Sequence, residues 1–404
     1  MGADVRTAFS VMSSGANQSS PRVAIVYDRL NSHGGAEKVL QELQTLYPEA
    51  PLYTSVYDAP SVPWLDPKRT VITSWLQYVP GAKTHHQWFG WLMPFLFESF
   101  DFSEYDIIVS ISSESAKGVL TQPDQLHINY MLTPTRYLWS HAAEYELQLP
   151  RLIRPLARLV FCILRAWDAT AANRPDVVVP ISQLVQNRVK EFYRRETRAP
   201  LYPPADVSPE IAAPKGAEML PESFFFSWGR HVAYKQFDTV IAASVYSKIP
   251  VVLAGNGPET KRLQALSRTV DAEGQYIFFV GECNDAELRW YLEKAAGSLF
   301  PQIEDFGIVI LESLLSGCPA IVNEKSGAAE LMTKHDGFKI SESTPRILAE
   351  SMQKMRAKPW QRLDIQKRAR QYAGVRFSQE WDRLVQSEWK KHQQALRQST
   401  ERNL

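Results

Sequence analysis

The sequence predicts an α/β protein with two consecutive domains, each built on a parallel β-sheet. Short apolar runs alternate with helix-like stretches along most of the 404 residues, which is the pattern of βαβ units. This alternation stops at residues 199–215, where 17 residues contain five prolines, and then restarts. The chain is also longer than one domain of ordinary size.

The first half opens on a predicted strand at residues 22–27, RVAIVY. A loop ending in Gly34-Gly35 follows, and then a helical pattern that Pro48 ends. Three further strands are predicted at residues 106–110, 127–131 and 176–180. Their continuous apolar character is typical of strands that are buried on both faces of a parallel sheet.

The second half repeats this organisation without repeating the sequence. Strands are predicted at residues 224–228, 251–254, 276–280, 298–301 and 320–322, with a charged amphipathic helix from Phe377. We therefore predict four parts: a disordered tail (1–20), an N-terminal domain (21–203), a C-terminal domain (204–376) and a C-terminal helix (377–404).

The composition excludes several classes of protein. The 45 Lys and Arg against 44 Asp and Glu give a net charge of +1, which argues against a dedicated nucleic-acid binder. The three cysteines have no metal-ligand spacing and cannot form a disulfide framework, which favours a reducing compartment. The first twenty residues contain no apolar core of a signal peptide, and no apolar run approaches the roughly 20 residues that span a bilayer. We expect a cytoplasmic protein.

The most informative stretch is residues 298–322, SLFPQIEDFGIVILESLLSGCPAIV. A strand, an acidic loop and a helix from about Gly307 to Ser316 follow one another, so the free N–H groups of Gly307, Ile308 and Val309 can bind an anion. Glu304 and Glu312 can accept hydrogen bonds from sugar and ribose hydroxyls. Alternatively, each is an ordinary solvated carboxylate.

Two further loops follow predicted strands. Arg230 and Lys235, five residues apart, can neutralise a diphosphate and stabilise it as a leaving group, or they belong to an ordinary basic loop. Gly34-Gly35 stands at a strand-to-helix turn. The stretch LAGNGPE (253–259) partly matches a dinucleotide fingerprint, but Thr260 occupies the third glycine position, so NAD binding is rejected.

Together these residues resemble the family-4 GT-B glycosyltransferases. The E-x7-E pattern is Glu304 and Glu312, the R-x4-K pair is Arg230 and Lys235, and the glycine turn is GGAEKVL. The stretches TPTRYLW, ANRPDVVVPIS and LYPPADV are similar to those of the WbaZ-type mannosyltransferase-like group. The resemblance implies two facing Rossmann-like domains and a C-terminal helix (377–404) that crosses back to the first domain. By the same resemblance, the N-terminal domain (21–203) is the acceptor-side domain and the C-terminal domain (204–376) is the nucleotide-sugar-binding domain.

The resemblance also implies the activity: retaining transfer of a hexose onto a lipid-linked or growing polysaccharide or oligosaccharide acceptor. The donor is a nucleotide diphosphate sugar, with GDP-mannose expected, UDP-glucose or another sugar nucleotide as alternatives, and no cofactor or metal. The absence of any Asp-x-Asp agrees with metal independence. A rival hypothesis is a non-catalytic sugar-nucleotide-binding subunit that supports another glycosyltransferase.

By the same resemblance, Glu304, Lys235 and Arg230 are the catalytic candidates. Arg230 and Lys235 hold the diphosphate, Glu304 holds the donor sugar and Glu312 holds the ribose. The remaining donor-binding candidates are Gly34, Gly35, Arg136, Gly281, Glu282, Asp305, Phe306, Gly307, Ile308 and Val309. One departure favours the rival: Leu132 stands where the family commonly has a histidine that points at the transferred sugar.

A membrane contact is predicted on the first domain. Arg151, Arg154, Arg158 and Arg165 recur at helical spacing among apolar residues, and residues 136–198 hold 11 Lys and Arg against 6 Asp and Glu. Residues 75–97 are rich in Trp and Phe. This pattern suits anionic lipid headgroups on the inner face of the plasma membrane, although the same residues could pack in the core of the first domain.

Overall fold

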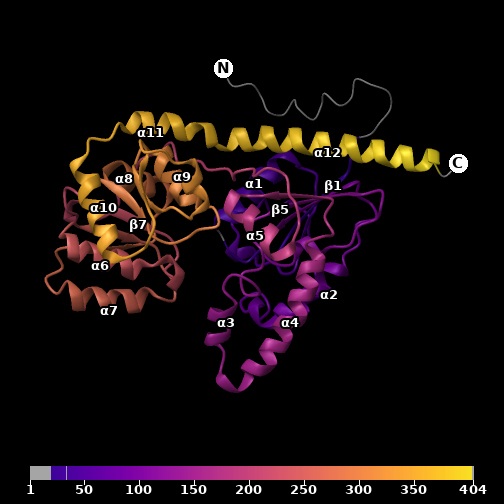
Figure 1. Cartoon of the computed structure of the whole chain (residues 1–404), viewed down its shortest axis with the longest axis horizontal. Coiled ribbons are helices and arrows are strands. Elements are labelled where there is room, and N and C mark those ends of the chain that lie inside the picture. Colours follow the sequence, from indigo (N-terminus) through magenta and orange to yellow (C-terminus); the bar gives the residue numbers. More distant parts are fainter. Residues whose placement is uncertain (1–19, 33, 403–404) are drawn as a thin grey trace.

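The computed structural model describes residues 20–32 and 34–402. Apart from Ser20, the tail predicted at residues 1–20 lies outside the described residues. Two lobes lie side by side, each built around a six-stranded parallel sheet (Figure 1). The predicted fold class is confirmed.

The first sheet has the strand order β3-β2-β1-β4-β5-β6. Its strands are β1 (Val23–Tyr27), β2 (Leu52–Thr54), β3 (Val71–Thr73), β4 (Ile107–Ser112), β5 (Leu126–Met131) and β6 (Val177–Pro180). All adjacent strands pair in parallel. The order reverses between β1 and β4, so a crevice forms at their carboxyl ends.

The second sheet has the order β12-β11-β10-β7-β8-β9, again entirely parallel. Its strands are β7 (Phe225–Trp228), β8 (Val251–Ala254), β9 (Ile277–Gly281), β10 (Gly297–Phe300), β11 (Ala320–Asn323) and β12 (Gly337–Ile340). Relative to the first strand of each domain, the two sheets have the same topology. The switch point here lies between β7 and β10.

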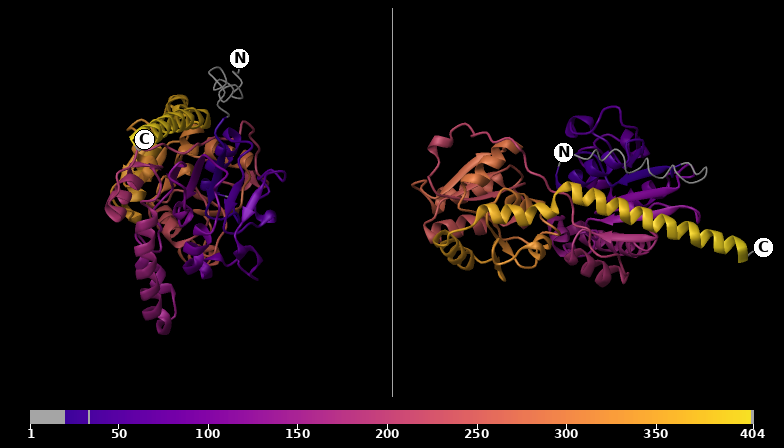
Figure 2. Two further views of the ribbon diagram at one scale, coloured as in Figure 1. Left: turned by 90° about the vertical axis from the view of Figure 1, so that its right-hand side faces the viewer. Right: turned by 90° about the horizontal axis from the view of Figure 1, so that it is seen from above.

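Helices cover both faces of each sheet (Figures 1 and 2). The first-domain helices are α1 (Gly35–Leu46), α2 (Met93–Glu98), α3 (Ala142–Gln148), α4 (Arg154–Ala171) and α5 (Gln183–Tyr193). The second-domain helices are α6 (Phe237–Ser247), α7 (Thr260–Val270), α8 (Asp285–Lys294), α9 (Ile308–Leu315), α10 (Pro345–Ala357) and α11 (Arg362–Ala369).

Alternate residues of the strands enter cores on opposite faces of the sheets. In β1, Ile25 packs toward α1, whereas Ala24 and Val26 pack toward Leu96 and Phe97 of α2. Every residue of β1 is buried, because a parallel sheet with helices on both faces leaves no strand face to water.

The C-terminal helix α12 (Gly374–Arg402) begins three residues before the predicted Phe377 and runs along the first domain (Figure 1). The Trp381 indole is fully buried there and donates a hydrogen bond to the Tyr47 hydroxyl at 3.1 Å. The outgoing chain at Ala205 and the returning chain at Ala373 form a parallel β-bridge. The two connections between the domains therefore lie side by side.

Helices α3 and α4 form a hairpin that projects from the first domain (Figures 1 and 2). A 3-10 turn at Arg151–Ile153 joins the two helices at its tip. Within the described part of the chain, no helix combines the length and apolar character needed to cross a membrane.

Candidate active site

A cavity of about 400 Å³ lies between the two domains. It forms at the carboxyl ends of β1, β4 and β5 on one side and of β10 on the other, where open parallel sheets bind ligands. Its polar and charged side chains come from both domains: Arg29, Ser113, Glu114, Thr133, Arg136, Tyr137 and Tyr145 from the first, and Tyr234, Lys235, Glu304 and Asp305 from the second.

The start of helix α9 faces this cavity. Gly307 precedes the helix with φ of +92°, a left-handed conformation that a residue with a side chain rarely adopts. Among the described residues, none accepts a hydrogen bond from the N–H groups of Ile308 and Val309. Gly35, at the start of α1, lies opposite: a Cβ atom there would come within 3.1 Å of Ile308. Two helix N-termini thus meet at one wall of the cavity, where they favour an anion.

Glu304 is buried beside this helix start and forms an ion pair with Lys235. The Gln302 side-chain amide donates a second hydrogen bond to the carboxylate at 3.1 Å. Burial opposes the charge of Lys235, but the adjacent Glu304 carboxylate raises the pKa of Lys235 above its usual value. The ammonium is therefore charged at neutral pH and is placed to bind a second anion.

Asp305 joins the two domains. Its carboxylate forms ion pairs with two first-domain arginines, Arg136 and Arg188, and the Arg136 Nε lies 2.8 Å from it. The Ser182 hydroxyl donates a hydrogen bond to the Asp305 carbonyl at 2.5 Å. The Arg136 guanidinium also lies over the Tyr234 ring. The Arg136 and Asp305 side chains thus hold the loop before α9 against the first domain.

Glu312 lies outside this cavity. It is buried inside α9, and its carboxylate forms an ion pair with Lys38 of α1 across the domain boundary. Together with Asp206 and Arg289, the pair lines a separate crevice of about 10 Å³. The Glu312 carboxylate, which is predicted to accept hydrogen bonds from the ribose, is therefore paired with a lysine in this structure.

A second cavity of about 800 Å³ lies in the second domain alone, after β7, β8 and β9. It is lined by Trp228, Gly229, Arg230, Ala254, Gly255, Asn256, Gly257, Glu282 and Cys283. Gly255 has φ of +118°, and a Cβ atom there would collide with the Gly229 carbonyl at 2.0 Å. A Cβ atom at Gly229 would lie 3.7 Å from the Lys235 Nζ. The two cavities therefore adjoin at Gly229 and Lys235.

The first-domain wall of the cavity between the domains combines apolar and charged groups. Leu132, in the position where the resemblance expects histidine, lines the cavity and is 8% exposed. The charged part is an ion pair of 2.7 Å between Arg29 and Glu114. Asp28 fixes the Glu114 loop, because its carboxylate accepts hydrogen bonds from the backbone N–H groups of residues 113–116 at 2.7–2.9 Å.

His86 lies near the arginines of both domains. Its Nδ1 lies 2.9 Å from the side-chain amide of Asn31. Burial and the positive charges of Arg29 and Arg230 lower the pKa of His86 to about 4. The imidazole is therefore neutral at pH 7 and adds no positive charge to that of Arg29 and Arg230.

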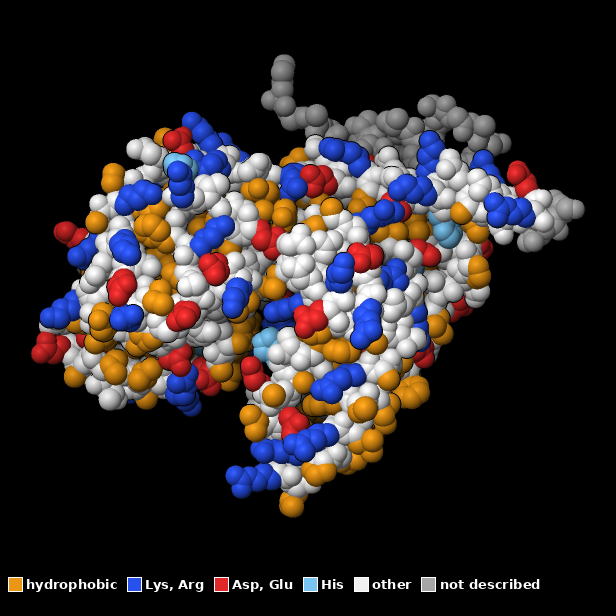
Figure 3. Space-filling view, viewed as in Figure 1, with side chains coloured by type: hydrophobic (Ala, Val, Ile, Leu, Met, Phe, Trp, Pro, Cys, Tyr) orange, Lys and Arg blue, Asp and Glu red, His pale blue; other side chains and the backbone are white. Residues whose placement is uncertain are grey.

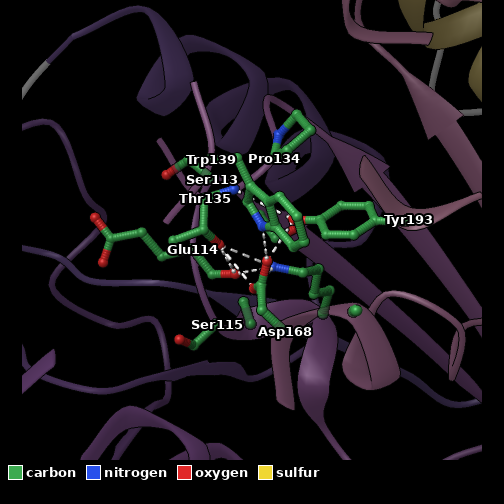
Figure 4. A network of polar contacts seen from close by, with 12 residues as sticks. Ser113, Glu114, Ser115, Pro134, Thr135, Trp139, Asp168 and Tyr193 are labelled. Atoms are coloured by element: carbon green, nitrogen blue, oxygen red, sulfur yellow. Dashed lines mark hydrogen bonds and ion pairs between the residues drawn. The ribbon is translucent and has the colours of Figure 1, made fainter. Parts of the chain in front are cut away.

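A buried polar network supports the cavity wall from behind (Figure 4). Lys117 and Asp168, both almost fully buried, form an ion pair of 2.6 Å. The Asp168 carboxylate also accepts hydrogen bonds from Thr135 at 2.8 Å, Trp139 at 2.7 Å and Tyr193 at 2.6 Å. These contacts anchor the loop that carries Thr133 and Arg136.

The structure brings most of the predicted residues together. The cavity between the domains is lined by nine of them: Gly35, Arg136, Lys235, Glu304, Asp305, Phe306, Gly307, Ile308 and Val309. The second cavity is lined by Arg230 and Glu282. Gly34, Gly281 and Glu312 line neither cavity, although the Gly281 carbonyl accepts a hydrogen bond at 2.6 Å from the N–H group of Gly255, which lines the second one. The roles assigned to these residues stay predictions. Sequence reasoning missed Arg29, Lys38, His86, Glu114, Arg188 and the glycines of the β8 loop.

The glycines of the β8 loop had a signal in the sequence. The stretch LAGNGPE partly matches a dinucleotide fingerprint, and its Gly255 and Gly257 line the second cavity. Arg29, Lys38, Glu114 and Arg188 had none, because their importance arises from contacts with residues 85 or more positions away in the chain.

Comparison with known proteins agrees with this architecture. Residues 210–372 match the family model "Glycosyl transferases group 1", which supports a role in sugar transfer. No curated protein is significantly similar to the chain. Similar solved structures include Anabaena HepE in complex with UDP (17% identity, 91% of this chain and 100% of that chain, TM-score 0.67). A second is sucrose-phosphate synthase from Thermosynechococcus elongatus (16% identity, 92% of this chain and 100% of that chain, TM-score 0.67). A third is the lipopolysaccharide outer core galactosyltransferase WaaB (14% identity, 91% of this chain and 99% of that chain, TM-score 0.61). At these identities the likeness establishes the fold.

Proposed function

We propose that the protein is a retaining, metal-independent glycosyltransferase. It transfers a hexose, with mannose from GDP-mannose as the first candidate, onto a lipid-linked or growing polysaccharide or oligosaccharide. One observation carries the proposal: the Lys235 ammonium, the Glu304 carboxylate and the starts of α1 and α9 converge on one cavity between two facing domains. This set suits a group that is anionic at one end and rich in hydroxyls at the other.

The division into two cavities suits a nucleotide sugar. The second-domain cavity, lined by Trp228, Arg230 and Glu282, has room for the nucleoside. The diphosphate then crosses the junction at Gly229 and Lys235, and the hexose reaches Glu304 in the interdomain cavity. Diphosphate binding competes with Glu304 for Lys235 and frees the carboxylate to accept hydrogen bonds from sugar hydroxyls. Similar solved structures include Anabaena HepE in complex with UDP and glucose and in complex with UDP-glucose.

In the proposed reaction, the bond between the anomeric carbon and the diphosphate oxygen breaks. The acceptor hydroxyl forms a new bond on the same face of the sugar, and its proton passes to the departing diphosphate. Lys235, Arg230 and the N–H groups of Ile308 and Val309 stabilise the negative charge that grows on the leaving group. Leu132 shapes the cavity but can neither accept a proton nor stabilise positive charge.

The acceptor belongs on the first-domain side. Arg29 and Glu114 are both partly exposed, line the cavity and come from loops that Asp28 holds together. An ion pair that offers both donors and an acceptor suits the hydroxyls of a glycan. Glu114 is a positioning group in this scheme, because its carboxylate is already paired with a guanidinium.

The rival function is a non-catalytic subunit that binds a sugar nucleotide and supports another transferase. Leu132 is the observation in its favour, since it leaves an apolar side chain in the cavity wall. Catalysis nevertheless accounts better for a buried cation, a buried carboxylate and two helix N-termini in one cavity.

A thermal-shift screen with GDP-, UDP- and ADP-sugars, followed by measurement of nucleotide release, separates these functions. A donor present at about 100 times its Kd stabilises the protein by about 2.7 kcal/mol. We expect one donor class to stabilise the protein and to release nucleotide when a glycan acceptor is added. Stabilisation without release under either condition would establish the rival function, and stabilisation by no sugar nucleotide would refute both.

A further inference from the structure

The outward side of helix α4 is apolar, which is the reverse of an ordinary surface helix. Its exposed residues are Pro155, Leu156, Arg158, Leu159, Cys162, Ile163, Ala166 and Thr170, so only two of the eight are polar. Leu156, Leu159 and Ile163 are 64%, 58% and 62% exposed. The residues that α4 buries against the protein include Asp168. A helix normally turns its polar face to water, so this face is built for contact with a partner.

The apolar stripe continues to the tip of the hairpin. Leu152, in the turn before α4, is 95% exposed and precedes Leu156, Leu159 and Ile163 at the spacing of one helix face. These four residues are called the α4 ridge below. Figure 3 shows hydrophobic side chains along the edge and at the tip of the projecting hairpin, with basic side chains beside them.

Exposed aromatic residues lie near the base of the hairpin. Trp88, Trp91 and Phe95 are 69%, 55% and 65% exposed. Their segment is linked to α4, because the Trp167 indole donates a hydrogen bond at 2.6 Å to Glu98 at the end of α2. Amphipathic aromatic rings are the side chains preferred at the boundary between water and lipid.

The charges beside the ridge are mainly positive. Arg151 at the tip and Arg158 on α4 are exposed, and Arg154 and Arg165 donate hydrogen bonds to backbone carbonyls of the hairpin region. Of the three acids in α3 and α4, Asp168 is buried against Lys117 and Glu146 is paired with Arg158, which leaves Glu144 exposed. A convex apolar ridge edged by arginines is complementary to anionic headgroups above an acyl layer.

We propose that the α4 ridge docks the protein on an anionic phospholipid bilayer. The four apolar side chains enter the acyl boundary, while Arg151 and Arg158 remain at headgroup level. A second copy of the chain is a poorer partner, because a twofold pairing of the ridge would bring the arginines of the two copies together.

The docked orientation has a consequence for the active site, which rests on the proposed function. Tyr145 of α3 and Tyr137 both line the interdomain cavity. The centroid of the Tyr137 ring lies 6.0 Å from that of Phe161 in α4. The hairpin that meets the bilayer therefore also forms part of the acceptor side of the cavity. This arrangement favours an acceptor whose reducing end is carried by a membrane lipid.

Co-sedimentation of the full chain with vesicles tests the docking independently of enzyme activity. The vesicles contain phosphatidylcholine alone or phosphatidylcholine mixed with phosphatidylglycerol. We compare the wild type, a ridge variant (Leu156→Ser, Leu159→Ser, Ile163→Ser) and a charge variant (Arg151→Glu, Arg158→Glu). The matched control changes three exposed apolar residues of the second domain, Ile211→Ser, Met219→Ser and Leu363→Ser, which are 52%, 79% and 72% exposed.

The wild type and the control should bind the phosphatidylglycerol vesicles at low salt and bind the neutral vesicles weakly. The ridge variant should bind at least about tenfold more weakly at every salt concentration, since it loses buried apolar area. The charge variant should lose a similar factor at low salt, because it loses attraction to the headgroups. Since all the replaced side chains are exposed, the ridge variant and the control should melt at the temperature of the wild type. The charge variant also breaks the exposed ion pair between Arg158 and Glu146, so it should melt slightly lower.

Three results would overturn the proposal. The first is a wild type that binds neither kind of vesicle. The second is a control that loses as much binding as the ridge variant. The third is a ridge variant that binds vesicles as the wild type does but changes from a dimer to a monomer in solution, which would identify a second copy as the partner.

Discussion

Replacing Lys235 with methionine is the most direct probe of the candidate active site. The Lys235 and Glu304 side chains are only 11% and 9% exposed, so the ion pair is largely shielded from water. Methionine keeps much of the aliphatic stem but removes the charge. The Glu304 carboxylate then retains the Gln302 amide, at 3.1 Å, as its side-chain donor.

The expected loss of stability follows from the buried carboxylate. Removing one partner of a buried ion pair costs about 3–5 kcal/mol. In a domain of about 150–250 residues each kcal/mol lowers the melting temperature by about 2–4 °C, so the second domain should melt roughly 6–20 °C lower. The double variant Lys235→Met, Glu304→Gln removes both charges and should recover most of this loss.

Turnover should respond differently from stability. Nucleotide release should be lost in the single variant and should remain lost in the double variant, because both lack the cation that the proposed mechanism places against the departing diphosphate. Differential scanning fluorimetry and a nucleotide-release assay on the same preparations separate the two effects. The reasoning is refuted if the single variant has the same melting temperature as the wild type, or if the double variant regains both turnover and stability.

Three further predictions concern the supports of the site. Asp305→Asn leaves Arg136 and Arg188 without their shared carboxylate, so the two domains should separate. Small-angle scattering should show a larger radius of gyration, and an unchanged radius would contradict the role of Asp305 in joining the domains. Asp168→Asn removes the partner of buried Lys117 and should cost about 3–5 kcal/mol in chemical denaturation, whereas a loss below about 1 kcal/mol would show that the network is dispensable. Burial, assisted by Arg195 and Arg174, lowers the pKa of His127 to about 3, against about 6.5 in the unfolded chain. The unfolded state therefore binds the extra proton, and stability should fall as the pH drops from about 6.5 to 3, by up to about 5 kcal/mol. His127→Gln should flatten this window, and an identical pH profile would refute the assignment.

The long apolar strands and the glutamate loop were predictable from the sequence because their signals are local. Residues 298–322 predict strand, loop and helix in order, and β10 and α9 lie within one or two residues of the predicted bounds. Strands β2, β3 and β12 were missed. They contain only three or four residues, too few to show a period against the surrounding loops.

The electrostatic partners in the site could not be predicted in the same way. Glu312 and Lys38 are separated by 274 positions, and their pairing depends on how two domains face each other. Asp305 illustrates the same limit: the family resemblance implied that it contacts the donor, yet its side chain binds Arg136 and Arg188. Sequence patterns identify the type of chemical group in a loop, whereas tertiary structure determines which partner that group meets.

The β-bridge between Ala205 and Ala373 marks the place where we expect the molecule to have a hinge. Because the two interdomain connections lie side by side there, the second domain can rotate as a unit with little deformation of either sheet. The ion pairs of Asp305 and of Glu312 act as latches for that rotation, since each joins a loop or helix of the second domain to the first. A donor that draws Lys235 from Glu304 leaves both latches closed, whereas one that engages Glu312 must displace Lys38. If the proposed sugar nucleotide is the ligand, the angle between the two domains should therefore report how deeply it is bound.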